Sequence, residues 1–359
     1  MPNCKNRQVV YIYICLYPIS RYPLESVKIT CDMGEHTVIY LDESYLSNMA
    51  KAQLGSLTDQ DECEFWLSLL EELKDKVLAD RIACPEFAFQ REEASFDTRI
   101  EEAVGRIIDE LSRGLKFNTW KDILNLHIED AAFKFLGKDP PQREMWTIAF
   151  TSNPQASLKS RMRGGYPRPN WGADVYPALQ NEIVEDKRQQ KASWVTFAER
   201  TLGPYTCRNW DEMLRRDKLY AVDCILGREA WSDAVTLGNI RSFVNRWMRL
   251  LEIGINDDNF MDFLKSDELL NSAFIDIHSS IRTAAAVNFP NRGQKGSDLY
   301  DPVILATVMP YCDIVTTDKF MKHISVTRLG LDKKYKCEVF SPSKEDRLDF
   351  QKGVRIASR

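Results

Sequence analysis

The sequence lacks the motifs of the common zinc-binding and disulfide-bonded classes of protein. None of its nine cysteines falls in a C-x-x-C pair, and its four histidines are scattered without an H-E-x-x-H spacing. An odd number of cysteines offers no closed disulfide framework. Zinc knuckles, helical zinc sites and disulfide-stapled scaffolds are therefore not expected, and the composition favours a reduced protein.

The chain also lacks a long hydrophobic run and a large excess of one charge. Its first apolar run, residues 9–17, is too short for a membrane span and ends in Pro18 without the small-residue pattern of a signal-peptide cleavage site. A formal net charge of -5 excludes a protein coated in basic surface but allows a local basic groove. We therefore expect a cytoplasmic protein with no membrane partner, which meets any nucleic acid locally.

The composition is that of a compact folded protein. Hydrophobic residues make up 44% and charged residues 28% of the 359 residues, which argues against wholesale disorder and fibrous architectures. The length allows one large domain or two ordinary ones, and no internal repeat is apparent.

Strand and helix patterns alternate at both ends of the chain. Residues 37–41 (TVIYL) form a short β-branched and aromatic run, which is typical of a buried strand. Residues 62–78 repeat apolar side chains at the spacing of one helix face. The same patterns predict a strand at 81–84, a helical stretch at 86–113, and strands at 313–317 and 335–340.

The middle of the chain carries amphipathic helical patterns and few strand patterns. Because the β signal lies at both ends, we expect one α/β domain assembled from both ends with helices inserted between them. The expected parts are an N-terminal extension (1–34), a discontinuous α/β domain (35–114 and 270–345), a helical insertion (115–269) and a C-terminal tail (346–359). The extension is either an extra edge strand or an appendage.

Acidic residues lie where these elements would meet at one edge of a parallel sheet. The carboxyl ends of parallel strands share one edge, and ligands normally bind there. Several carboxylates at one edge repel each other unless cations neutralise them, and hard oxygen ligands suit Mg²⁺ or Mn²⁺. The acids expected at this edge are Asp42, Glu92, Glu93, Asp298, Asp301 and Asp318.

Two parts of the sequence resemble the PIN-like nuclease family. Residues 38–46 (VIYLDESYL) resemble the opening of PIN domains, in which a hydrophobic strand ends in an Asp and a small polar residue begins a helix. Residues 296–306 (GSDLYDPVILA), followed by 311–319 (YCDIVTTDK), are similar to the family's Asp-led helix and its terminal strand ending in T-x-D. The resemblance covers residues 35–100 and 270–345 and leaves the helical middle unexplained.

The resemblance implies a fold and a chemistry. The fold is an α/β, PIN-like three-layer arrangement, with a central mainly parallel sheet flanked by helices and a large, mostly helical insertion. The chemistry is hydrolysis of phosphodiester bonds by water at Mg²⁺ or Mn²⁺ ions held by carboxylates. Matching positions carry catalytic and metal-ligand roles onto Asp42, Asp301 and Asp318, and Thr316 assists them.

The family's glutamate lies on the helix after the second strand, where this chain offers Glu86, Glu92 and Glu93. We choose Glu93, because two helical turns separate it from Pro85, whereas an acid in the first turn more often serves the helix dipole. Glu43 departs from the Ser or Thr that usually follows the family's first Asp. Two further acids, the candidate ligand Asp298 and the strand-start residue Asp313, either support the metal ligands or act as ordinary cap and strand residues.

A basic and aromatic loop at residues 158–171 is the candidate substrate contact. Cations can hold phosphates and aromatic rings can stack on unpaired bases, although the same composition fits a solvated surface loop. The candidate phosphate-binding residues are Lys159, Arg161, Arg163 and Arg168.

Three functions are compatible with these patterns. The leading one is a metal-dependent endoribonuclease, whose role as a toxin or defence effector would rest on family analogy. The alternatives are a catalytically inactive PIN-like module that binds RNA or protein, and a structure-selective DNA nuclease. The preference for RNA comes from the family, and the helical insertion is the expected contact for a protein partner or a second copy of the chain.

Overall fold

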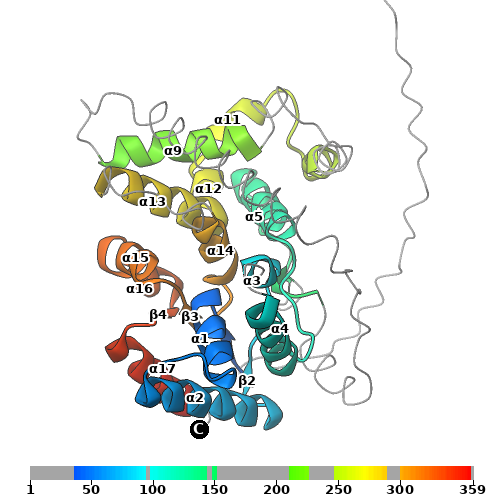
Figure 1. Cartoon of the computed structure of the whole chain (residues 1–359). Helices are drawn as coiled ribbons and strands as arrows, with labels where there is room; N and C mark the ends of the chain where they lie inside the picture. Colours follow the sequence, from blue (N-terminus) through cyan, green and yellow to red (C-terminus); the bar gives the residue numbers. More distant parts are fainter. Residues whose placement is uncertain are drawn as a thin grey trace, which may run out of the picture. The chain divides into compact units, whose positions relative to one another are not determined.

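The computed structural model describes residues 36–93, 98–143, 148–151, 210–225, 246–288 and 300–356. Within them, helices surround a small sheet of four parallel strands in the order β2-β1-β3-β4 (Figure 1). The described part of the protein is therefore α/β and mostly helical. Its strands are β1 (Thr37–Tyr40), β2 (Ile82–Ala83), β3 (Ile314–Thr316) and β4 (Glu338–Phe340).

Strand β1 is central because it pairs on both sides and all but its first residue are buried. The register aligns Ile39 with Ile314 and Tyr40 with Val315. Successive side chains in a strand point to opposite faces, so Ile39 and Leu41 enter one apolar layer while Tyr40 faces the other.

One face of the sheet is covered by an apolar cluster built from four helices and the strands. The expected helix at 62–78 is confirmed as α2, and a side-chain oxygen of Asp59 accepts the Glu62 amide at its start. The residues expected to form a C-terminal tail instead form a helix whose Phe350 and Val354 are fully buried, because they complete this core. The four helices are α1 (Glu43–Gln53), α2 (Gln60–Leu78), α4 (Thr98–Ser112) and α17 (Lys344–Ile356).

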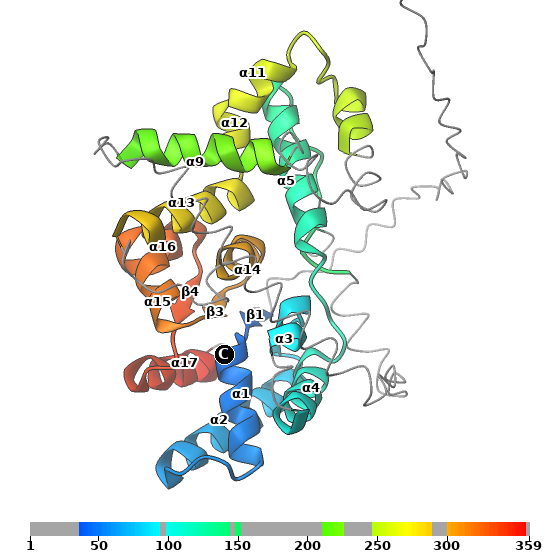
Figure 2. The same cartoon turned by 45° about the horizontal axis from the view of Figure 1, so that its top comes forward.

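A second group of helices, from α5 to α14, lies beyond the other face of the sheet, and α15 and α16 lie beside β4 (Figure 2). Helix α13 packs against α14 and α9, and α5 packs against α12, α13 and α14. Residues 246–253 are also helical. The helices in these two positions are α5 (Trp120–Phe135), α9 (Trp210–Ile225), α11 (Phe260–Lys265), α12 (Asp267–Leu270), α13 (Ala273–Asn288), α14 (Asp301–Val308), α15 (Lys319–Lys322), the π-helix η4 (His323–Arg328) and α16 (Leu331–Tyr335).

Two predicted elements differ from the structure. In the helical stretch expected at 86–113, the described residues form two helices, α3 (Ala88–Glu93) and α4. The first of them begins only at Ala88, because Glu86 exchanges backbone hydrogen bonds with Leu115 and Phe117 and stays extended. The strand expected at 335–340 begins only at Glu338. Tyr335, the first residue of the expected strand, is the last residue of α16. Lys336, which follows it, ends the helix in a left-handed conformation (φ 54°).

By its contacts, the chain divides into Met1–Met33, which lies outside the described residues, and Gly34–Arg359. The helices expected to form an insertion therefore belong to the same compact unit as the sheet. No helix in the described ranges is both long and apolar enough to cross a membrane.

Candidate metal centre at the carboxyl edge of the sheet

The strands that follow β1 in the chain lie on opposite sides of it, which makes a switch point in the strand order between β1 and β3. From β1 the chain crosses through α1 and α2 to β2 on one side, while β3 and β4 lie on the other side. Open α/β sheets bind ligands in the crevice outside the carboxyl ends of the strands at such a switch point. The residues that directly follow β1 and β3 are therefore the first candidates for a functional site.

Asp42 lies at the end of β1 and caps α1. Its Oδ2 atom accepts hydrogen bonds from the Ser44 hydroxyl at 2.8 Å and the Ser44 amide at 3.3 Å. Ser44 thus supplies a small polar side chain two positions after Asp42, with Glu43 between them. These bonds stabilise the start of α1 and fix one carboxylate oxygen of Asp42.

Thr316, the last residue of β3, is fully buried and joins the two central strands. Its hydroxyl accepts a hydrogen bond from the Asp42 amide at 2.7 Å and donates one to the carbonyl of Tyr40 at 3.3 Å. The threonine of the T-x-D segment therefore sits directly behind Asp42.

Asp318 lies two residues beyond β3 and caps α15, accepting the Met321 amide at 2.6 Å. Burial raises the pKa of Asp42 to about 6; the hydrogen bonds from Ser44 lower it, and the negative charges of Glu43 and Asp318 raise it further. The carboxylates that follow β1 and β3 are thus close enough to repel each other. Such a pair is stabilised by a bound cation.

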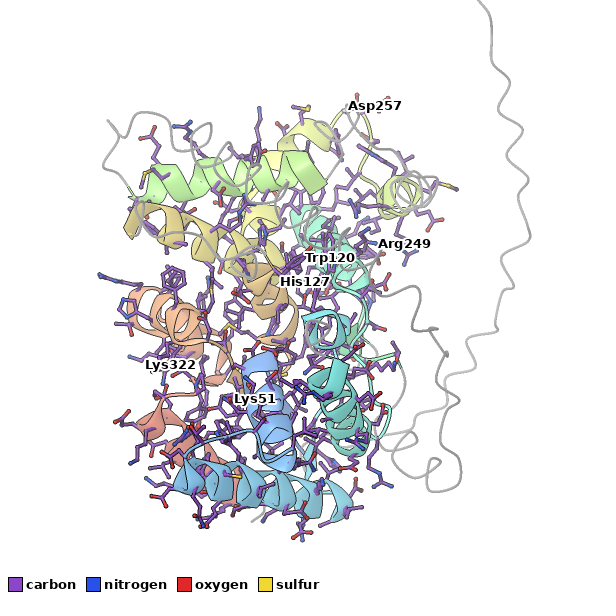
Figure 3. The ribbon with its side chains drawn as sticks, viewed as in Figure 1. Lys51, Trp120, His127, Arg249, Asp257 and Lys322 are labelled. Atoms are coloured by element: carbon purple, nitrogen blue, oxygen red, sulfur yellow. The ribbon has the colours of Figure 1, made fainter. Side chains whose placement is uncertain are left out.

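Helix α15 also carries a basic side chain. Lys322, labelled in Figure 3, donates to Asp346 Oδ1 at 2.6 Å. Its positive charge is therefore paired with the C-terminal helix.

Asp301 is the first residue of α14 and is buried, with 9% of its surface exposed. The ring of the preceding residue, Tyr300, packs on Phe89 of α3 with a centroid distance of 5.0 Å. The structure thus brings the start of α14 against α3, the helix that carries the candidate glutamates.

Several predicted site residues cannot be placed at this edge. The side chains of Glu92 and Glu93 lie outside the described residues, as do Asp298 and the whole basic loop with Lys159, Arg161, Arg163 and Arg168. Asp313 lies at the amino end of β3, where its carboxylate accepts the Val38 amide at 2.8 Å and its own amide donates to the Val38 carbonyl. Asp313 therefore binds the amino-terminal half of β1 and lies away from the acids that follow the strands.

Glu86 also has a different position from the one expected. It precedes α3 instead of starting it, and its buried carboxylate pairs with Lys116 at 3.3 Å. The helix-dipole interpretation of this acid is wrong, because pairing with residues 115–117 holds the chain extended here.

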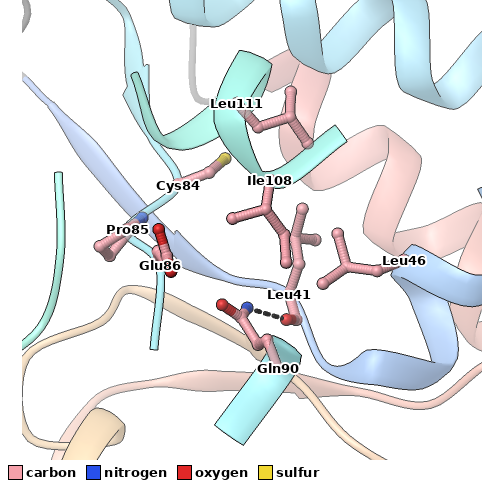
Figure 4. A pocket seen from close by; sticks show the side chains of 8 residues that line it. All are labelled: Leu41, Leu46, Cys84, Pro85, Glu86, Gln90, Ile108 and Leu111. Atoms are coloured by element: carbon pink, nitrogen blue, oxygen red, sulfur yellow. Dashed lines mark hydrogen bonds between the residues drawn. The ribbon is translucent and has the colours of Figure 1, made fainter. Parts of the chain in front are cut away.

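The sequence did not point to Gln90, which is buried with only 3% of its surface exposed. Its side-chain amide donates to the carbonyl of Leu41 (Figure 4) and accepts the Phe87 amide at 2.7 Å. It borders a cavity of about 10 Å³, roughly the space of one water molecule and too small for a substrate. Nothing in the sequence marks this glutamine, since its partner lies on a distant strand.

The donor set suits a hard divalent cation only in part. Mg²⁺ keeps several waters and is commonly bound by one or two carboxylates together with substrate phosphates. Asp42 and Asp318 supply such a pair. In the described part of the chain, no three His, Cys, Asp or Glu side chains are grouped closely enough to hold a metal ion.

Comparison of the chain with protein-family models, with curated proteins and with solved structures found no match.

Proposed function

We propose that the protein is a metal-dependent endoribonuclease of PIN type, which hydrolyses phosphodiester bonds at the edge formed by β1 and β3. One observation carries this proposal. Asp42 and Asp318 follow the two central parallel strands at the switch point, and the charge of Asp318 raises the pKa of Asp42.

The strand order supports a PIN-like architecture in the two parts of the chain that resemble the family. An all-parallel sheet with β1 at its centre has the expected aspartate after its first strand and the T-x-D segment after its third. Helices that pack buried side chains against one face of the sheet, and further helices beyond its other face, are compatible with a three-layer fold.

In this proposal Asp42, Asp318, Asp301 and Glu93 would hold Mg²⁺ or Mn²⁺. The bound cation would supply Lewis-acid stabilisation of the phosphate oxygens and a lowered pKa for the attacking water. The protein's part is to orient the carboxylates: Ser44 fixes one oxygen of Asp42, and Thr316 holds the Asp42 backbone.

The geometry of α3 favours Glu93 over Glu92 as the fourth ligand. Residues three and four apart lie on one face of a helix, whereas residues two apart do not. Position 93 is three residues from Gln90, which reaches the end of β1, and four from Phe89, which packs beside the start of α14. We therefore propose position 93, which shares a helix face with both Gln90 and Phe89, as the ligand that would join Asp42 and Asp301.

The substrate class is proposed by resemblance. Single-stranded or structured RNA would contact the basic loop through Lys159, Arg161, Arg163 and Arg168. A toxin or defence role and a cytoplasmic location belong to the same proposal, as does contact with a protein partner or a second copy through the helical insertion.

An inactive PIN-like module that binds RNA or protein is the second candidate. The observation favouring it is that the described residues bring together two of the expected carboxylates, without a third close enough to share a metal ion. A structure-selective DNA nuclease differs from the main proposal only in the polymer that is cut.

A cleavage assay separates these functions. The full-length protein is incubated with end-labelled single-stranded RNA and DNA of one sequence, in Mn²⁺ and in EDTA. We expect Mn²⁺-dependent RNA cleavage that Asp42→Asn and Asp318→Asn each reduce at least about 100-fold, as removal of a charge-stabilising group does.

Asp59→Asn is the matched control, because Asp59 caps α2 in the same way but lies away from the sheet edge. It should cleave like the wild type. Cleavage that both site variants retain would exclude the proposed mechanism. RNA binding without cleavage by the wild type would favour the inactive module.

A further inference from the structure

Gln90 and Thr316 approach the same peptide group from opposite sides. The carbonyl of Leu41 and the amide of Asp42 belong to one planar unit. Gln90 donates to that carbonyl, and the Thr316 hydroxyl accepts from that amide at 2.7 Å. Both side chains are buried, at 3% and 0% exposure.

These two side chains supply the hydrogen bonds that neighbouring strands would supply if the sheet continued. Pairing between β1 and β2 ends at Val38 and Ala83, and pairing between β1 and β3 ends at Tyr40 and Val315. The peptide that follows β1 would otherwise have no partner on either side, and an unsatisfied buried backbone group is costly. Gln90 and Thr316 therefore satisfy the carbonyl and the amide of this peptide.

The direction of each bond follows from its partner. The Phe87 backbone N–H can only donate, so the oxygen of the Gln90 amide must accept it and its nitrogen must face the carbonyl of Leu41. A glutamine satisfies both partners at once. A glutamate keeps the first bond and loses the second, and a methionine of similar length loses both.

We propose that Gln90 is a positioning residue of the carboxylate site: with Thr316 it clamps the Leu41–Asp42 peptide and so fixes the direction in which the Asp42 carboxylate leaves the sheet. Hydrogen bonds on both ends of one peptide also polarise each other. The same amide ties α3 to β1 (Figure 4). Its consequence for metal binding rests on the proposed function.

The test compares Gln90→Met and Gln90→Glu with the wild type in two measurements. The first, made without metal, is the hydrogen-exchange rate of the Asp42 amide by NMR, which should rise in both variants. The second is Mn²⁺ affinity by electron paramagnetic resonance, which should fall about 10- to 100-fold, the usual effect of removing a group that orients a ligand.

Thr316→Val should have the same effects, and Thr316→Ser, which keeps the hydroxyl, should restore both values. Because both residues act on one peptide, the losses in Gln90→Met/Thr316→Val should be smaller than the product of the single losses. Gln351→Met is the matched control. Gln351 is a buried glutamine on α17 that donates to Glu72 at 3.2 Å, and its loss should change neither measurement.

Folded Gln90 variants with wild-type exchange and wild-type Mn²⁺ affinity would overturn the inference. If Gln90→Met does not fold, as judged by circular dichroism, Gln90→Glu and the Thr316 pair decide the outcome. Absence of Mn²⁺ binding by the wild type would instead overturn the proposed function. The exchange rate at Asp42 would still decide whether the clamp exists.

Discussion

At the residue scale, Asp42 combines two roles that oppose each other. Its side chain caps α1, which stabilises the fold, but burial raises its pKa to about 6, so the charged form is disfavoured. The folded pKa exceeds the ordinary value of 3.8. The folded state therefore holds more protons between these pH values, and stability falls as pH rises through that window.

We accordingly predict that Asp42→Asn stabilises the metal-free protein. Asparagine caps helices as well as aspartate and carries no charge. A rise in the pKa from 3.8 to about 6 corresponds to about 3 kcal/mol at most. Because the Asp42 residue is only half-buried by its surface area, the expected gain at pH 7.5 is ~1–2 kcal/mol. Urea unfolding in EDTA measures the gain. It should vanish below pH 4, and a variant less stable than the wild type at pH 7.5 would contradict the prediction.

At the scale of elements, local pattern predicted strands and helices well where short-range forces decide. The β-branched run at 37–41 and the helix at 62–78 needed no tertiary information. Asp42 and Asp318 could be placed at one edge because parallel strands end together. Breaks caused by distant partners could not be predicted: Glu86 stays extended because it pairs with residues 115–117.

The same limit applies to the candidate site. Gln90 has no signature because its function depends on the carbonyl of Leu41, 49 positions away in the sequence. For Asp313 the sequence leaves two roles open, support of the metal ligands or an ordinary position at the start of a strand, because its order in the chain does not say which end of the sheet it contacts. Its pairing with Val38 places it at the amino end of the sheet.

Helix α9 docks on α13 through a buried ion pair, which gives a prediction about these elements. Lys218 donates to Asp276 at 2.6 Å, and Asp276 also accepts Lys334 at 2.7 Å and Tyr335 at 2.8 Å. Lys218 and Asp276 are both buried, at 6% and 4% exposure. Lys218→Met removes one partner of a buried charge and should lower the free energy of unfolding by about 3 kcal/mol.

The half-exposed Lys334 is the control, since Lys334→Met should cost at most about 1 kcal/mol. The double variant Lys218→Met/Asp276→Leu should be less unstable than Lys218→Met alone, because it also removes the buried carboxylate that has lost its buried cationic partner. Chemical denaturation of the three variants measures these differences. Equal losses in Lys218→Met and Lys334→Met would show that burial of the ion pair is not what holds α9.

At the scale of the whole molecule, His127 joins the helices expected to form the insertion to the sheet domain. From α5, its Nδ1 atom accepts the Phe274 amide at 3.1 Å, and its Nε2 atom lies 2.5 Å from the Tyr311 hydroxyl, just before β3. Phe274 also stacks on the ring of Trp120 of α5. Figure 3 labels Trp120 and His127. A backbone N–H can only donate, so Nδ1 carries no proton and the imidazole is neutral.

This junction predicts a loss of stability in acid. Burial, with the nearby charge of Lys134, lowers the pKa of His127 to about 4, against an ordinary value of 6.5. The unfolded state therefore binds more protons between these values, and stability falls as pH drops through them, by up to about 3 kcal/mol at pH 4. His127→Gln, which cannot titrate, should show a shallower loss over the same range in urea unfolding. A His127 ring that titrates near pH 6.5 in the folded protein by NMR would show that protonation does not oppose this junction and would contradict the prediction.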